Sequence, residues 1–160
     1  MPADIETLAA RLQRLEDIEE IRALFLRYAD CLDANDFAGY ANLFASDGEL
    51  LAQLGSAVGP AAIQALLEER LGTDIAKARA VSFHVISNPV IEVDGDRGSA
   101  RVLWSYLTQR AEDPHPILIQ AGHYTDDLRR ENGRWKIARH AITRDMGFSP
   151  IEAATAAAAS

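Results

Sequence analysis

Cysteine, aromatic side chains and long apolar runs are all scarce in this sequence, and each scarcity excludes a class of protein. The 160 residues contain one cysteine, Cys31, so no disulfide can form within the chain and a reducing compartment is expected. No stretch approaches the roughly 18 apolar residues of a membrane-spanning helix. The opening residues, MPADIETLAA, lack the basic start and apolar run of a secretory signal. We therefore expect a cytoplasmic protein that does not bind membranes.

Basic residues are also in the minority. The 16 Lys and Arg residues face 24 Asp and Glu residues, and the net charge of -8 argues against a nucleic-acid partner. The chain lacks a glycine-rich phosphate loop, a nucleophile elbow and an HExxH motif, and its four histidines match no common metal spacing. We therefore expect no metal and no cofactor.

The length fits one domain, since about 150 residues per domain is a reasonable prior. We assign this domain to residues 1–150 and treat residues 151–160, IEAATAAAAS, as an alanine-rich tail that forms a surface helix or a frayed end. Apolar residues recur every three or four positions from about Asp4 to Leu32, which predicts a long amphipathic helix. The stripe consists of Leu8, Leu12, Leu15, Ile18, Ile21, Phe25, Tyr28 and Leu32.

Two further helices and five strands complete the expected order. Asp36 is a plausible cap for a short helix over FAGYANLFA, and Pro60 opens a third helix over AAIQALLEERL. GELLAQL predicts a strand between them, followed by a loop over GSAVGP. Four alternating segments then follow, separated by turn signals such as Asp94-Gly95 and Asn132-Gly133. This order predicts an α+β fold in which helices pack on one face of a curved antiparallel sheet.

The stretch YADCLDAND ends the first helix with three aspartates, where the negative pole of the helix dipole disfavours acids. Asp33 has a plain interpretation as a turn residue. It would also be stabilised by a cation, and a protonated histidine on a facing strand could supply one. His84 lies within SFHVISNPV, where alternation places it on one face with Ile86. It is either a hydrogen-bonded structural residue or a general base that Asp33 orients.

The remaining candidates are ambiguous in the same way. Tyr28 lies on the apolar stripe and would need a hydrogen-bond partner if it were buried. Trp104 and Tyr106 share one strand face, where they would form core or cavity wall, and Arg144 closes the last strand. The other three histidines, His115, His123 and His140, are interpreted as structural.

Three blocks of the sequence resemble the SnoaL-like branch of the nuclear transport factor 2-like superfamily. They begin DIEEIRALFLRYADCLDANDF, SFHVISNPVIEV and AGHYTDDLRRENGRW, and they lie between about Asp17 and Asp145. The resemblance implies a cone in which three helices and a strongly bent sheet enclose a deep cavity. Within the superfamily the motifs are most similar to those of cofactor-free dehydratases and dehydrohalogenases: bile acid 7α-dehydratase, scytalone dehydratase and hexachlorocyclohexane dehydrochlorinase.

By this resemblance Asp33 orients a catalytic His84, and Tyr28 donates a hydrogen bond to a substrate carbonyl or a leaving hydroxyl. Arg144, Trp104 and Tyr106 are then candidates for substrate contacts. The implied function is a cofactor-independent lyase, with isomerisation as a related outcome, acting on a small hydrophobic cyclic molecule. The alternatives are a non-catalytic domain that binds a small ligand and an assembly domain. Each of these predicts a homo-oligomer, either a dimer or a trimer, because a single bent sheet has an outer face that needs covering.

Overall fold

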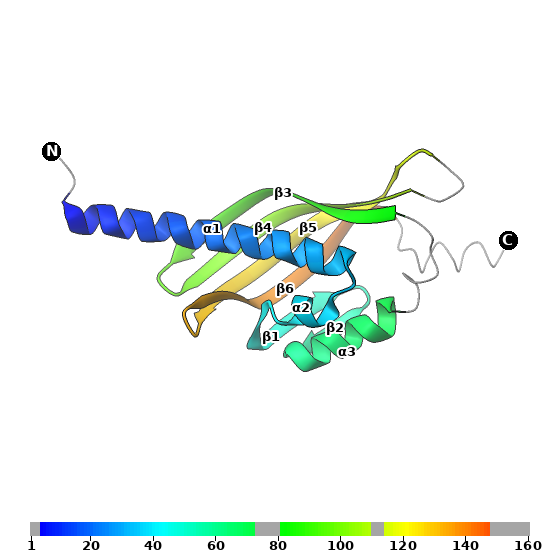
Figure 1. Ribbon diagram of the computed structural model, residues 1–160, viewed down its shortest axis with the longest axis horizontal. Coiled ribbons are helices and arrows are strands. Elements are labelled where there is room, and N and C mark those ends of the chain that lie inside the picture. The colour runs from blue at the N-terminus through cyan, green and yellow to red at the C-terminus, as the bar shows by residue number, and fades with distance from the viewer. Residues whose placement is uncertain (1–3, 73–80, 110–113, 148–160) are drawn as a thin grey trace.

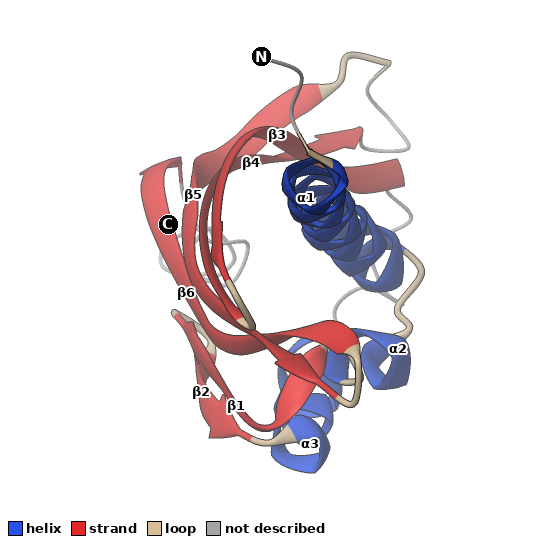
Figure 2. Ribbon diagram, turned by 90° about the vertical axis from the view of Figure 1, so that its left-hand side faces the viewer, coloured by secondary structure: helices blue, strands red, loops and turns tan. Residues whose placement is uncertain are grey.

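The computed structural model describes residues 4–72, 81–109 and 114–147, and within them a curved six-stranded sheet carries helices on its concave side (Figure 2). The strand order is β2-β1-β6-β5-β4-β3. The expected α+β class and curved sheet are confirmed. The expected alanine-rich tail over 151–160 lies outside the described residues.

Helix α1 spans Ile5–Asp33 and begins at the cap residue Asp4, whose side chain accepts a hydrogen bond from the Thr7 amide. Its second half packs against the sheet through buried residues such as Ile21, Leu24 and Tyr28. The single apolar stripe expected for this helix is wrong in its first half. There Leu8, Leu12 and Leu15 are exposed, and Figure 1 shows this end of the helix extending beyond the sheet.

Two shorter helices lie at the β1–β2 end of the sheet. Helix α2, Phe37–Ala41, is capped by the Asp36 side chain, which accepts from the Gly39 amide as the sequence predicted. Helix α3, Pro60–Leu71, begins with proline in its first turn and buries Ile63 and Leu67.

The sheet contains one strand that the sequence did not predict. This strand is β2, Gly55–Val58, which lies in a segment where a loop was expected. It pairs antiparallel with β1, Phe44–Ala52. Strand β1 also pairs in parallel with β6, so the sheet is not wholly antiparallel. The short β2 is an edge strand that pairs with β1 on one side only. Its residues Gly55 and Ser56 are of types common in loops, so the local pattern predicted a loop here.

The four long strands form the meander expected from the turn signals. Strand β3 spans Val81–Asp94, β4 spans Arg97–Gln109, β5 spans Ile117–Glu131 and β6 spans Arg134–Gly147. Two-residue turns join β3 to β4 and β5 to β6, and both contain glycine with a positive φ. The core lies between α1 and the concave side of this meander. Its largest fully buried side chains are Tyr28, Tyr40, Tyr124, Phe25, Phe44, Ile21, Leu24, Leu50, Ile63, Leu67, Ile137 and His140.

Candidate active site

Helix α1 ends at the residue that the sequence analysis singled out. The amide of Asn35 donates to the Leu32 carbonyl, and the amide of Asp36 donates to the Cys31 carbonyl at 2.8 Å, the pattern of a Schellman motif. Asn35 supplies the left-handed backbone with a φ of 57°. This ending leaves Asp33 on the last helical turn, facing β3.

The Asp33 carboxylate binds His84 at three points. Oδ1 of Asp33 lies 2.7 Å from Nδ1 of the imidazole, and the His84 backbone amide donates to Oδ1 and Oδ2 at 3.1 and 3.0 Å. These contacts offset the unfavourable dipole at the helix end and fix both the position and the rotation of the ring. The Asp33 and His84 side chains remain 25% and 21% exposed, so neither is sealed within the core.

Tyr106 is the neighbour of His84 across the sheet. The two residues are register partners on β3 and β4, and their ring centroids lie 4.8 Å apart. Within the described part of the chain, no hydrogen bond involves Nε2 of His84. An imidazole whose Nδ1 is held by a carboxylate and whose Nε2 is open can accept a proton from another molecule.

A second hydrogen-bonded group lies in the core and includes Tyr28. The Tyr28 hydroxyl lies 3.2 Å from Nε2 of His140, whose Nδ1 lies 2.5 Å from Oδ1 of Asp126. All three side chains are almost completely buried. The structure therefore places Tyr28 in a different hydrogen-bonded group from His84, one formed by α1, β5 and β6.

Burial sets the protonation of this buried group. It raises the pKa of Tyr28 well above 10, although hydrogen bonds from Tyr40 and Tyr124 act in the opposite direction, so the hydroxyl keeps its proton at neutral pH. Burial also raises the pKa of Asp126, against the opposing effect of His140. The pKa of Tyr124 is raised well above its usual value, by burial first, then by Tyr28 and Asp126, and least by the charge of Asp33.

Sequence reasoning missed the group around His140. That histidine was interpreted as structural, and Asp126 carries no distinguishing signal, because it is one of two adjacent aspartates on β5. The β5–β6 register shifts between Asp127 and Leu128, close to the pair, so simple alternation along the strands does not reveal which residues face inward. A buried His opposite a buried Asp can be found only once the register is known.

Two of the predicted substrate-contact residues, Trp104 and Arg144, lie along one row of the concave side, and Tyr106 lies in the row that contains His84. Ile86, Trp104, Gly122 and Arg144 are successive register partners across β3, β4, β5 and β6. Trp104 is only 5% exposed and stacks on Tyr124 with ring centroids 5.7 Å apart. Its indole Nε1 is buried, and none of the described residues accepts its hydrogen bond.

A third His–Asp pair lies on the opposite side of the sheet. Nδ1 of His123 is 2.7 Å from Oδ2 of Asp145, the same distance as in the His84 pair. His123 is the register partner of Leu103 and Thr143, one residue away from the row that contains Trp104 and Arg144. Because side chains alternate along a strand, this pair points to the convex side.

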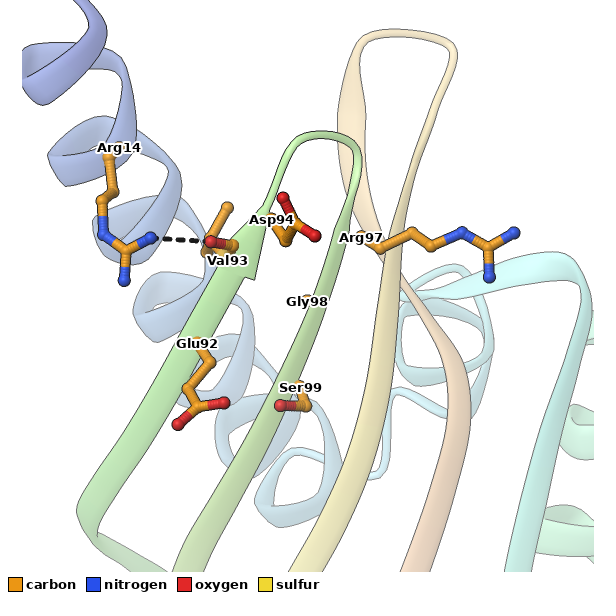
Figure 3. Close-up of a pocket in the computed structure, with 7 residues that line it drawn as sticks. All are labelled: Arg14, Glu92, Val93, Asp94, Arg97, Gly98 and Ser99. Carbon is orange, nitrogen blue, oxygen red and sulfur yellow. Dashed lines mark hydrogen bonds between the residues drawn. The ribbon is translucent and has the colours of Figure 1, made fainter.

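Two hollows on the surface lie away from these groups. One, of about 360 Å³, lies between α1 and the β3–β4 hairpin, where Nη1 of Arg14 donates to the Val93 carbonyl at 2.7 Å (Figure 3). Arg97 and Ser99 also line it. The other, of about 470 Å³, lies near Cys31 and Lys136. None of the predicted site residues lines either hollow.

The described residues show neither a ready-made metal site nor a membrane-spanning helix. They contain no group of three or more His, Cys, Asp or Glu residues arranged to hold a metal ion. None of their helices is both long and apolar enough to cross a membrane.

The curved sheet with helices on its concave side defines an α+β protein of the nuclear transport factor 2-like, cystatin-like type. Residues 13–141 match the model of the SnoaL-like domain, and the chain belongs to this family. The family and fold expected from the sequence are therefore confirmed. A search of curated proteins gave no match.

Three solved structures illustrate the similarity. An NTF2-like protein with a cystatin-like fold from Novosphingobium aromaticivorans is 27% identical with a TM-score of 0.79, and the match covers 96% of this chain and 97% of that one. ActVI-ORFA from Streptomyces coelicolor is 25% identical with a TM-score of 0.72, covering 82% and 97%. A candidate scytalone dehydratase from Novosphingobium aromaticivorans is 25% identical with a TM-score of 0.67, covering 82% and 86%.

Proposed function

We propose that this SnoaL-like protein is a cofactor-independent lyase that eliminates water, or a similar small leaving group, from a small hydrophobic cyclic substrate. Isomerisation by the same proton transfer is a related outcome. The observation that carries the proposal is the His84–Asp33 pair, which is held at three points and remains partly exposed. Similarity to a candidate scytalone dehydratase adds support.

In this proposal His84 is the general base. Its Nε2 removes a proton from the carbon next to a substrate carbonyl, and the electron pair of that C–H bond forms the new C=C bond. The bond to the β-hydroxyl breaks, and the hydroxyl takes up from Nε2 of the imidazolium the proton that His84 removed from carbon, so that it leaves as water and His84 returns to its neutral form. Asp33 holds the Nδ1 proton and stabilises the imidazolium that forms.

Tyr28 is the proposed donor to the developing oxyanion or to the leaving hydroxyl. Its high pKa keeps the proton available, but the same proton can be used by Nε2 of His140, 3.2 Å away. Tyr28 can therefore donate to a substrate only while His140 carries a proton on Nε2.

Substrate contacts are assigned to Tyr106, Trp104 and Arg144. Tyr106 packs against the His84 ring, so it would form the wall next to the reacting carbon. The Trp104 Nε1 proton has no acceptor among the described residues, and a buried donor of this kind is stabilised by a polar atom of a ligand. Arg144 lies in the same row of the sheet and would bind a polar substituent.

We also propose a cytoplasmic location and self-association through the convex side of the sheet. Phe83 and Val85 flank His84 on β3 and are exposed on the side opposite to it, and Leu118 on β5 and Met146 on β6 are exposed as well. An exposed apolar patch of this kind is typical of an interface.

The experiment is a dehydration assay with a β-hydroxytetralone, whose loss of water gives a naphthol that can be followed by fluorescence. His84→Gln should lower kcat by about 10²–10⁴-fold, the range of general-base catalysis, and Asp33→Asn should also lower it. His123→Gln is the matched control, because it breaks an identical His–Asp contact on the convex side and should leave the rate unchanged. A folded His84→Gln variant with full activity would contradict the proposal.

A non-catalytic binding or assembly domain is the second candidate. It is favoured by the filling of the concave side, where Phe25, Trp104 and Tyr124 are buried against other side chains. A bound cyclic hydroxy-ketone recovered unchanged from the wild-type protein would support ligand binding without chemistry.

A further inference from the structure

The first three turns of α1 carry an apolar stripe that no other described residue covers. Figure 1 shows this part of the helix extending beyond the sheet. Every residue from Asp4 to Glu16 is exposed. Ile5, Leu8, Leu12 and Leu15 are 84%, 50%, 57% and 64% exposed, and four large apolar residues on one helix are unfavourable in water.

The spacing of this stripe is that of a coiled coil. Ile5, Leu8, Leu12 and Leu15 are separated by three, four and three residues, which places Ile5 and Leu12 at a positions of a heptad repeat and the other two at d positions. Isoleucine at a with leucine at d favours two parallel strands, and the first heptad, with Ile5 and Leu8, follows this rule, whereas the second a position holds leucine. The next two seam positions hold Glu19 and Arg22, which form an ion pair within the helix, so the apolar seam ends there.

The charged residues beside the stripe indicate that its partner is a second copy of the same helix. In a parallel pair, a g residue of one helix faces the e residue five positions later on the other helix. Here those positions hold Arg11 and Glu16, which have opposite charges. Two copies of this helix in parallel register would form the Arg11–Glu16 contact twice, once on each side of the seam.

The rest of the domain leaves room for this pairing. The residues of α1 that pack on the sheet, including Asp17, Ile21 and Tyr28, lie on nearly the opposite side of the helix from the stripe, at roughly 100° per residue. The two sheets would therefore lie on the outside of the paired helices. We propose that residues 5–16 of α1 form a short parallel two-helix coiled coil with a second copy of this chain, an interface separate from the convex side of the sheet.

Molar mass measured on the full chain by sedimentation tests the stripe. Leu8→Gln combined with Leu12→Gln should weaken association through this helix at least about a hundredfold and so lower the measured mass, whether or not the convex-side contact persists, because four leucines per dimer leave the seam. Ala10→Gln is the matched control, since Ala10 lies on the side of the same helix that faces away from the stripe. It should leave the mass unchanged. A wild-type protein that is monomeric, or a Leu8, Leu12 variant with unchanged mass, overturns the proposal.

Charge exchange tests the parallel register. Arg11→Glu alone and Glu16→Arg alone should each weaken association about tenfold, because both contacts become repulsive. The double variant should restore it. Failure of the double variant to recover would contradict the parallel pairing.

A cross-link gives an independent readout. In a Cys31→Ser background, Leu12→Cys should form a disulfide between two chains in a glutathione redox buffer, and Ala10→Cys should not. Absence of the Leu12→Cys cross-link overturns the proposal.

Discussion

Replacing Asp17 with asparagine should lower the free energy of unfolding by about 3 kcal/mol, because this carboxylate joins α1 to the β5–β6 hairpin. Its side chain is only 8% exposed. Oδ1 accepts from Nε2 of Gln13 at 3.0 Å and from Nε1 of Trp135 at 3.2 Å, and it forms an ion pair with Arg130.

The magnitude follows from what remains after the change. Breaking a buried ion pair typically costs about 3–5 kcal/mol, because the remaining charge is left without its partner. Arg130 keeps the Asp96 carboxylate at 3.1 Å and lies over the Trp135 ring, and it is partly exposed, so the lower end of that range applies. For a chain of this size, a loss of about 3 kcal/mol corresponds to a fall in Tm of about 6–12 °C.

The assay is urea unfolding followed by circular dichroism. Asp96→Asn is the matched control, because Asp96 binds the same arginine but its side chain is 80% exposed. The control should change stability by no more than about 1 kcal/mol. Equal effects of the two variants would refute the argument that burial determines the contribution of Asp17.

The same carboxylate predicts a pH dependence. Burial by itself raises the pKa of Asp17, but the hydrogen bonds from Gln13, Trp135 and Arg130 outweigh it and hold the pKa below its usual value of 3.8. A lowered pKa in the folded state adds stability above the unfolded pKa, and this stability is lost as the pH falls through the folded pKa. The difference between wild type and Asp17→Asn should therefore shrink below about pH 4.

Two further predictions concern the end of α1 and the core beneath it. Tyr28→Phe should cost about 1–3 kcal/mol in urea unfolding, because Nε2 of His140 would lose its partner in a fully buried site; no loss would contradict the observed contact. Asp36→Ala should cost about 1 kcal/mol by removing the cap that accepts from Gly39, while Asp30→Ala on the exposed side of α1 should cost far less, and equal losses would argue against capping.

Much of the fold could be predicted from local patterns. Period-two alternation and the Gly95 and Gly133 turns are local, so the four-strand meander and its two tight turns were predicted. The β1–β6 parallel pairing and the edge strand β2 could not be, because each depends on where a distant segment lies. The prediction of a single apolar stripe on α1 was wrong for a related reason, because the spacing of apolar residues alone does not tell how far the sheet extends along a helix.

The candidate site likewise contains one contact that was predicted and one that was not. Asp33 and His84 are 51 residues apart, and no spacing rule relates them. Their pairing was predicted from the family resemblance, and the structure places the two side chains in contact. The buried contact between His140 and Asp126 is formed across a shifted register, which the sequence does not reveal.

The most direct test of the account is the protonation of each ring nitrogen of His84, measured by ¹⁵N NMR in the wild type and in Asp33→Asn. If Asp33 orients the ring for general-base catalysis, the neutral imidazole should carry its proton on Nδ1 and leave Nε2 unprotonated. Neutralising Asp33 should then shift the proton toward Nε2. A wild-type ring protonated on Nε2, with the same tautomer in Asp33→Asn, would contradict the role proposed for this pair.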